Sequence, residues 1–265
     1  FRKLTDFFVG GALRRRSKSR QRRLIEFVLP RIIGLMVHKR ETLTKKERAA
    51  EEAFVAKLDI KKRKTGTPFL VAVIGLVGSG KSSVGQELAK HIDATVIKGD
   101  AIRIELRKQN ERYEQTRAIA ENVALEVVRW GGSVVLDSDF VDEKKRASLH
   151  EKARKAGVRL VFVRTHCDLD VMVGRVFTAI YHDKVDDFFG GASSTWTGSE
   201  QRRGATVKVR EMWRRTPHHY RWINQGGGKW VLKKLRFTIF AEIDTTDSDL
   251  WKREVKKVAK RILAL

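Results

Sequence analysis

The chain has 265 residues, of which 42% are hydrophobic and 8% aromatic, and its net charge is +24. This composition supplies enough apolar side chains for a packed core, which excludes wholesale disorder. Apolar runs are too short for a transmembrane helix. The single cysteine, Cys167, excludes an intramolecular disulfide and is typical of a reducing compartment, so we expect a cytoplasmic protein.

The positive charge is concentrated at the start of the chain. Residues 1–66 carry 20 Lys/Arg against 7 Asp/Glu, whereas residues 67–265 carry 36 against 25. Such a field attracts nucleic acid, ribosomes or anionic lipid, although a role in solubility alone is an equally open alternative. We predict that residues 1–66 form a basic helical extension, with nucleic acid or an anionic membrane surface as the candidate partner and peripheral membrane association as one consequence.

Two helices are predicted in this extension. Residues 24–38 have a broad apolar face, which Pro30 kinks or divides. Thr44 and Glu47 fit a capping box, so a second helix is expected to begin there and to end near Leu58. Packing against the rest of the protein explains the first helix as simply as binding to a membrane or nucleic acid does.

Apolar strands then alternate with helices through the remainder of the chain. Strands are predicted at residues 69–74, 94–100, 133–140, 158–165 and 237–244. Helices are predicted at residues 82–91, 110–130, 142–156, from Asp168 onward, and at 248–264. Strands separated by helices of this length predict an α/β fold, with a parallel five-stranded sheet between two layers of helices.

A glycine loop follows the first strand and leads directly into a helix. The stretch "GLVGSGKS" matches G-x-x-x-x-G-K-[ST] through Gly75, Gly80, Lys81 and Ser82. Glycines let successive backbone N–H groups surround phosphate oxygens, and the helix directs its positive end to the same place. In such loops the lysine reaches the β- and γ-phosphates and the serine ligates Mg²⁺. The sequence therefore predicts a nucleoside triphosphate site formed by Gly75, Gly78, Ser79, Gly80, Lys81, Ser82 and Ser83.

Acidic residues follow the next two strands, where ligands bind in α/β sheets. Asp100 comes just past the second strand, with Arg103 three residues later, and Asp137 and Asp139 end the third strand. Transfer to a hydroxyl needs one carboxylate to take a proton and another to support the metal. We assign Asp137 to the metal, with Ser82, and leave Asp100 as the base; a turn or helix cap is the alternative for each aspartate.

The phosphate loop, the D-x-x-R of Asp100 and Arg103, and the aspartate at Asp137 together resemble the small P-loop kinases. That group includes polynucleotide 5′-kinases, chloramphenicol phosphotransferase and zeta-type toxin kinases. The resemblance covers about residues 68–250 and implies a P-loop NTPase three-layer α/β/α domain at residues 67–265, in addition to the basic extension.

The resemblance also implies roles for individual residues. Members of the group phosphorylate a hydroxyl using ATP and Mg²⁺, and the aspartate matching Asp100 acts as general base. The arginine matching Arg103 binds an acceptor phosphate in the polynucleotide kinases, and we assign Asp139 to the same substrate side. Thr245, in "EIDTTD", matches in position a loop that borders the adenine base in related kinases.

A lid and acceptor region is expected at about residues 175–235. Arg175 is the best match to the family's lid arginines, which neutralise the migrating phosphoryl group; a solvated helix face is the alternative. Further candidates are Arg202, Arg203, Arg210 and Arg214. The region also holds four tryptophans, which fit either a core or the stacking of nucleobases: Trp196, Trp213, Trp222 and Trp230.

Two functions are consistent with these residues. The first is an ATP-dependent phosphotransferase that moves the γ-phosphate to a hydroxyl of a polynucleotide, a nucleoside or another small molecule, with Lys81, Asp100 and Arg175 as catalytic residues. The alternative is a nucleotide-gated ATPase or binding module that its basic N-terminal helices recruit to RNA, a ribosome or a membrane. The sequence shows no switch motif of the kind that gated modules use.

Overall fold

The computed structural model describes residues 42–61, 67–138, 140–179 and 200–265, with backbone only for 200–204. Residues 42–265 form one compact unit. The predicted helix at 24–38 and the candidate Asp139 lie outside the described residues.

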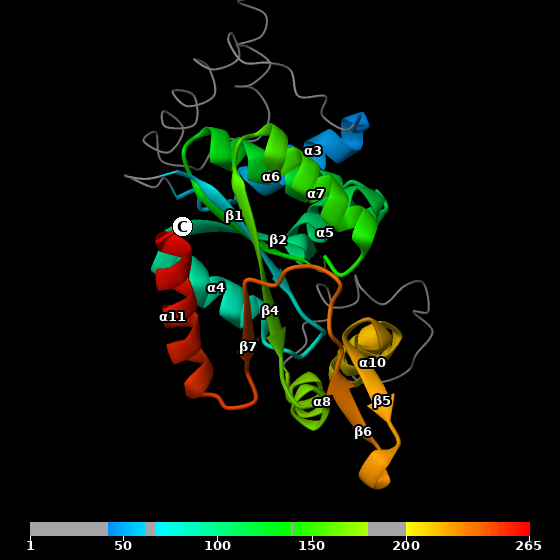
Figure 1. Cartoon of the computed structure of the whole chain (residues 1–265). Coiled ribbons are helices and arrows are strands. Elements are labelled where there is room, and N and C mark those ends of the chain that lie inside the picture. The colour runs from blue at the N-terminus through cyan, green and yellow to red at the C-terminus, as the bar shows by residue number, and fades with distance from the viewer. Residues whose placement is uncertain (1–41, 62–66, 139, 180–199) are drawn as a thin grey trace, which may run out of the picture. The chain divides into compact units, whose positions relative to one another are not determined.

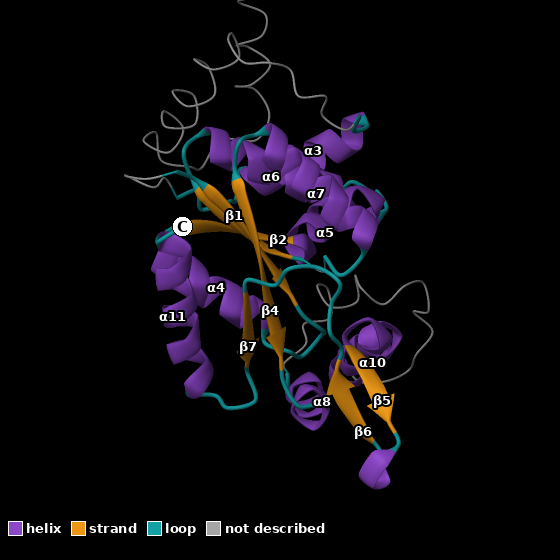
Figure 2. Ribbon diagram, viewed as in Figure 1, coloured by secondary structure: helices purple, strands orange, loops and turns teal. Residues whose placement is uncertain are grey.

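Within this unit, five parallel strands form one sheet in the order β2-β3-β1-β4-β7. The strands are β1 (Phe69–Ile74), β2 (Ala94–Lys98), β3 (Ser133–Asp137), β4 (Arg159–His166) and β7 (Ala241–Asp244). Because β1 is central, the loop that follows it opens at the middle of the sheet's carboxyl edge, between the ends of its neighbours β3 and β4 (Figures 1 and 2).

Helices cover both faces of the sheet (Figure 1). They are α3 (Lys45–Val55), α4 (Lys81–Ile92), α5 (Gly99–Lys108), α6 (Thr116–Arg129), α7 (Glu143–Lys155), α8 (Leu169–Thr178), α10 (Glu200–His219) and α11 (Leu250–Leu263), with short 3₁₀ turns η1 (Tyr113–Gln115) and η3 (Gln225–Gly227). Helices α4 and α11 pack on one face, and α3, α5, α6 and α7 pack on the other. None of the helices in the described ranges is long and apolar enough to cross a bilayer.

Strand β1 shows why this sequence forms a sheet buried on both sides. All six of its residues are buried. Leu70 and Ile74 pack into the core with α3, α5, α6 and α7, whereas Val71 and Val73 pack into the core with α4 and α11. An uninterrupted apolar run is what a central parallel strand requires, because helices cover both of its faces. The predicted parallel sheet with two helical layers is confirmed.

Helix α3 belongs to the same core as the sheet. The predicted capping box is confirmed: the Thr44 hydroxyl accepts from Glu47 N at 3.2 Å, and Glu47 Oε2 accepts from Thr44 N at 2.7 Å. Ala50 and Phe54 are buried in the core with α5 and α6. The compact unit therefore begins at Thr42, earlier than the boundary at residue 67 that the sequence suggested.

Glu105 ties α3 to α5, and its ionisation should make this contact sensitive to acid. Burial opposes its ionisation, but hydrogen bonds from Lys57 at 2.6 Å and Lys108 at 3.0 Å outweigh burial and hold the Glu105 pKa below its usual value. A carboxyl group with a lowered pKa in the folded state stabilises the protein above its unfolded pKa and loses this contribution as pH falls through the folded pKa.

Replacing Glu105 with glutamine should therefore lower the free energy of unfolding at neutral pH, and the difference from the wild type should shrink in acid. Urea unfolding at several pH values measures this. Glu254→Gln, which removes an exposed i,i+3 pair with Lys257 on α11, is the control and should change stability little at any pH. If Glu105→Gln lost the same unfolding free energy at neutral and acid pH, the ionised Glu105 carboxylate would not be the source of the stability.

The structure corrects two predicted elements and adds three. The predicted helix at 110–130 is wrong in its start, because α6 begins only at Thr116. A separate helix, α5, forms before it at Gly99–Lys108, and Asn110, with φ +57°, lies in the non-helical segment between the two. The last strand is shorter than predicted, with only Ala241–Asp244 in the sheet. Three elements were not predicted, namely α10 and the antiparallel strands β5 (Tyr220–Ile223) and β6 (Lys229–Leu232).

We refer to α10, β5 and β6 together as the α10–hairpin unit. Its buried side chains Met212 and Tyr220 pack against Met172 of α8 and Leu76 of the glycine loop. Arg164 of β4, 1% exposed, joins the unit to the sheet. Its guanidinium donates to the carbonyls of His219 at 2.9 Å and Lys233 at 2.8 Å, which flank the hairpin, and to Glu242 Oε1 at 3.3 Å on β7.

Replacing Arg164 with methionine is expected to loosen the α10–hairpin unit. Hydrogen bonds to a charged group contribute about 1.5–3 kcal/mol each, so losing them should lower the free energy of unfolding by about 3 kcal/mol. Hydrogen exchange should rise first in residues 205–236. Arg159→Met, at the exposed start of the same strand, is the control. Unchanged exchange in the hairpin of the Arg164 variant would show that this arginine does not hold the unit.

Candidate active site

The glycine loop forms the floor of the site. It connects β1 to α4, which begins at Lys81, so the positive end of this helix faces the loop. Gly78 and Gly80 have φ of +84° and +75°, in the left-handed region that residues with a Cβ rarely adopt. These two positions therefore require glycine, and the backbone between them has the curvature that directs N–H groups at an anion.

The loop is braced from behind by buried hydroxyl groups. Ser79 Oγ lies 2.8 Å from Thr165 Oγ1 of β4, and the Ser79 N–H donates to Leu76 O at 3.1 Å. The Thr245 hydroxyl donates to Ser79 O at 3.0 Å. Both Ser79 and Thr245 are buried, at 0% and 2% exposure, and neither side chain lines the pocket. They hold the loop's shape, and direct contacts of theirs with a nucleotide stay predictions.

Replacing Gly75 with alanine should disturb this bracing. A Cβ on Gly75 would lie 2.2 Å from Thr165 Oγ1 and 2.4 Å from Ser79 Oγ. Such overpacking typically costs about 1–3 kcal/mol, and here it also displaces the loop. We expect a lower melting temperature and weaker nucleotide binding by calorimetry. Gly174→Ala in α8, where a Cβ meets nothing within 4 Å, is the control. Wild-type nucleotide affinity in the Gly75 variant would contradict the bracing role.

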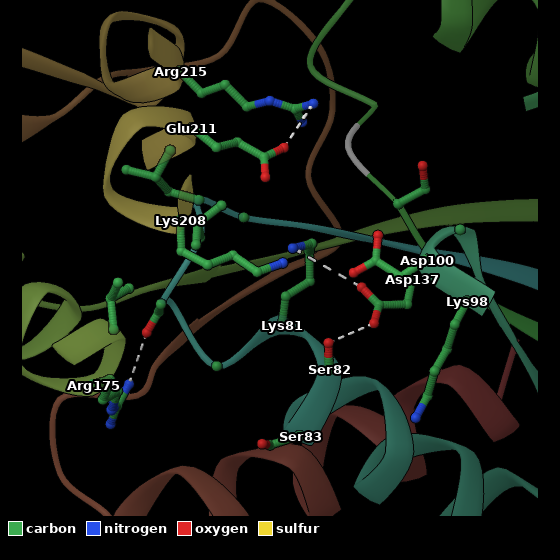
Figure 3. Close-up of a pocket in the computed structure, with 18 of the residues that line it drawn as sticks. Lys81, Ser82, Ser83, Lys98, Asp100, Asp137, Arg175, Lys208, Glu211 and Arg215 are labelled. Atoms are coloured by element: carbon green, nitrogen blue, oxygen red, sulfur yellow. Dashed lines mark hydrogen bonds and ion pairs between the residues drawn. The ribbon is translucent and has the colours of Figure 1, made fainter. Parts of the chain in front are cut away.

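Ser82 and Asp137 bring two oxygen donors together at the start of α4. Ser82 Oγ donates to Asp137 Oδ2 at 2.6 Å, and Lys81 Nζ lies 4.0 Å from Asp137 Oδ1 (Figure 3). A hydroxyl and a carboxylate are hard donors of the kind that Mg²⁺ takes when phosphates and water supply its other ligands. The described residues contain no cluster of three His, Cys, Asp or Glu that could hold a metal alone. The pair therefore fits a metal that arrives with a phosphate ligand.

Asp100 lies in the first turn of α5 and also lines the pocket. Its side chain is 58% exposed, and Arg103 Nη1 donates to its Oδ1 at 2.7 Å. Figure 3 shows Asp100 and Asp137 directed into the same space as the ends of Lys81 and Lys208. The structure thus brings a metal-compatible carboxylate and a second, solvent-reachable carboxylate to one pocket.

The pocket has a volume of about 440 Å³, and the α10–hairpin unit contributes one of its walls. Lys208, Glu211 and Arg215 line it from α10, with Arg215 Nη2 3.1 Å from Glu211 Oε1 (Figure 3). The cations in the lining outnumber its acids, Asp100, Asp137 and Glu211; they are Lys81, Lys98, Arg103, Arg175, Lys208 and Arg215. Such a lining favours anionic ligands.

Three of these cations, Lys98, Lys208 and Arg215, were not predicted from the sequence. Lys208 and Arg215 are seven residues apart, so they share one face of α10, whereas the proposed Arg210 and Arg214 are exposed on another face. Side chains of Arg202 and Arg203 lie outside the described residues. If α10 had been predicted, the helical spacing of its basic residues would have distinguished the pocket-lining pair from the exposed pair.

Arg175 is in the pocket wall but is also engaged within the protein. Its guanidinium donates to Gly78 O at 3.3 Å, to Thr245 Oγ1 at 3.0 Å and to the Thr245 carbonyl. It therefore joins α8 to the glycine loop and to the end of β7. Contact with a migrating phosphoryl group stays a prediction. Cys167, which follows β4, is buried as expected, and burial raises the pKa of its thiol.

Comparisons with known proteins give a consistent set of similarities. Residues 70–178, less than half of the chain, match the family described as AAA domain. A gluconokinase from Sinorhizobium meliloti superposes with a TM-score of 0.43 at 18% identity, over 75% of this chain and 95% of that chain. The APS kinase of Mycobacterium tuberculosis, solved with AMPPNP and APS, superposes with a TM-score of 0.44 at 16% identity, over 76% of this chain and 98% of that chain. A shikimate kinase from Bacteroides thetaiotaomicron superposes with a TM-score of 0.42 at 14% identity, over 74% of this chain and 99% of that chain. No curated protein matches the chain significantly.

Strand order and loop together define the class of fold. A parallel sheet with the glycine loop after its central strand, and a helix that begins at the loop's lysine, is a P-loop NTPase fold. The predicted fold class is therefore confirmed. Membership of the polynucleotide kinase group within it stays a prediction.

Proposed function

We propose that the protein is a P-loop kinase that transfers the γ-phosphoryl group of ATP to a hydroxyl acceptor. One observation carries the proposal. Lys81 lies within ion-pair distance of Asp137 and Ser82 within hydrogen-bond distance of it, on the loop side of a pocket that Asp100 also lines. A phosphate-binding loop alone supports nucleotide binding, and the additional carboxylate supports activation of an acceptor.

The loop amides and Lys81 would hold the β- and γ-phosphates of ATP. Ser82 and Asp137 would hold Mg²⁺, which supplies charge neutralisation at the phosphate oxygens when bound. Asp100 would accept the proton of the acceptor hydroxyl while its oxygen attacks the γ-phosphorus. The bond from the γ-phosphorus to the β,γ-bridging oxygen breaks, and ADP leaves with that oxygen.

The basic wall of the pocket would complete the site. Arg103 orients Asp100 through its 2.7 Å hydrogen bond and would bind the acceptor. Lys208 and Arg215 would approach the transferred group from α10, where a cation stabilises the charge that develops on its equatorial oxygens. The acceptor class stays open among polynucleotide ends, nucleosides, sugars and other alcohols.

Incubation with Mg²⁺ and γ-labelled ATP against a panel of these acceptors tests the proposal. We expect label to appear on at least one acceptor. Label that appears only as inorganic phosphate, at a rate unaffected by every acceptor, would support the nucleotide-gated ATPase instead and would contradict the kinase assignment.

A further inference from the structure

Positive charge in the described chain is concentrated in the α10–hairpin unit. Residues 205–236 contain nine Lys/Arg and one Asp/Glu. The core at residues 67–179 contains 18 Lys/Arg and 15 Asp/Glu, and residues 237–265 contain six Lys/Arg and five Asp/Glu. The core is therefore nearly balanced, and the excess belongs to the element that forms one wall of the pocket.

Most of these cations face solvent and not the pocket. The sole acid of residues 205–236, Glu211, is in the pocket lining with Arg215. The exposed cations of the same stretch are Arg210, Arg214, Arg221, Lys229, Lys233, Lys234 and Arg236. The outer surface of the unit thus presents a positive field with no exposed carboxylate among residues 205–236, which is the electrostatic property of a polyanion-binding surface.

Two large aromatic rings are exposed among these cations. Trp213 is 55% exposed and Trp222 is 51% exposed. Arg210 precedes Trp213 by three residues and Arg214 by four on α10, so both of these side chains are neighbours of Arg210 on the helix surface. Exposed tryptophan interleaved with arginine combines a stacking surface with phosphate-binding groups.

The Trp222 ring is exposed yet held in place. Its ring centroid lies 5.4 Å from that of Trp230 at an interplanar angle of 69°, and Trp230 packs against the buried cluster that includes Tyr220. Gly228 also contacts the indole so closely that a Cβ at this position would lie 2.1 Å from the ring. A ring already fixed by its neighbours loses little conformational entropy when a ligand stacks on it.

The register of the hairpin separates its inner and outer residues. Tyr220 pairs with Leu232 and Trp222 with Trp230, and this face packs toward α8 and α10. The alternating residues Arg221 and Lys229 belong to the opposite face and are exposed. Trp222 therefore shares a face with Trp230 but is half exposed, and Arg221 and Lys229 lie next to this pair on the other face of the two-stranded hairpin.

We propose that the outer surface of the α10–hairpin unit binds single-stranded nucleic acid, with its cations on the phosphates and Trp222 and Trp213 stacking on unpaired bases. The charge favours a polyanion over an apolar protein partner, and the exposed rings favour unpaired bases over a duplex, in which the base faces are covered. The proposal concerns binding and does not depend on phosphoryl transfer. It is also separate from the residues 1–66, which lie mostly outside the described ranges.

Fluorescence anisotropy with the full chain and a labelled oligouridylate of about 20 nucleotides, longer than one module's site, tests this surface. Arg221→Glu combined with Lys229→Glu should weaken binding about tenfold. Losing two phosphate contacts should also reduce the slope of log K against log salt by about 1.4, since each contact on a single strand contributes about 0.7. The matched control is Lys256→Glu with Lys260→Glu on α11, which covers another part of the sheet (Figure 1).

Two substitutions of Trp222 separate stacking from general apolar contact. Trp222→Leu should lose about tenfold in affinity, whereas Trp222→Phe, which keeps a π-face, should retain most of it. Melting curves identify any variant that fails to fold. If a Trp222 variant does not fold, the Arg221/Lys229 variant and its α11 control decide the outcome. Equal loss in the α11 control, wild-type affinity in the Arg221/Lys229 variant, or equal binding by the two folded Trp222 variants would overturn the proposal.

Discussion

Replacing Lys81 with alanine is expected to lower kcat/KM for phosphoryl transfer by about 10³-fold, because removing one preorganised charge from a transition state costs about 10²–10³-fold or more. The Lys81 side chain is only 19% exposed, and its Nζ lies 4.0 Å from Asp137 Oδ1, so it is already directed at the metal side of the site. Neighbouring groups cannot replace a charge fixed in this way. Initial rates with γ-labelled ATP measure the effect.

The matched control for this variant is Lys90→Ala. Lys90 lies on the same helix, is 69% exposed, and forms an i,i+3 ion pair with Glu87. Surface pairs of this kind contribute little to stability, so the control should keep wild-type rates. If the Lys81 variant retained more than a tenth of the activity, the loop lysine would not be the charge that the reaction uses.

Replacing Asp100 with asparagine should abolish measurable transfer while ATP affinity stays near that of the wild type. A general base contributes about 10²–10⁴-fold, and asparagine keeps the shape and the oxygen that Arg103 contacts but accepts no proton. The expected signature is a loss in kcat with little change in the dissociation constant for ATP. Calorimetry and labelled-phosphate transfer measure the two quantities separately.

Asp93→Asn serves as the control, because Asp93 is an exposed carboxylate that ends α4 and its positive φ is tolerated by asparagine. It should change neither quantity. Unchanged turnover in the Asp100 variant would remove Asp100 from the mechanism. A parallel loss of ATP binding would assign it to the nucleotide.

The layered sheet was predictable because its signals are local. The run at β1 is apolar throughout, and the glycine loop, the capping box at Thr44 and the helix that starts after Asp168 each depend on a few adjacent residues. These features confirm the predicted fold. The predicted start at residue 110 was wrong because α5 forms first; Ile102 and Leu106 form its apolar stripe at helical spacing within a strongly charged stretch.

The α10–hairpin unit could not be predicted in the same way. Its hairpin turn contains three consecutive glycines with positive φ, and its strands have only four residues each. It is held by Arg164, whose partners are 55 to 78 residues away in the chain. A buried arginine in a strand gives no sequence signal for contacts with distant carbonyls, and the basic pocket wall that depends on it was missed for the same reason.

The candidate site residues also differ in whether they depend on local sequence signals or on distant contacts. The loop and Asp137 could be proposed from the sequence because each sits at the end of a recognisable strand, and their contacts with a ligand stay predictions. The bracing of the loop by Thr165 and Thr245 depends on contacts between strands, and burial of a hydroxyl is not visible in a single sequence. A local motif is thus more predictable from one sequence than the distant residues that hold it in shape.

A crystal structure of the chain with a non-hydrolysable ATP analogue and Mg²⁺ would show directly how the pocket holds the nucleotide. It should show the terminal phosphate against Lys81 and the loop amides, the metal bound by Ser82 and Asp137, and the Asp100 carboxylate facing the γ-phosphorus. A nucleotide bound elsewhere on the protein, or Asp100 turned away from that phosphorus, would contradict the proposed function.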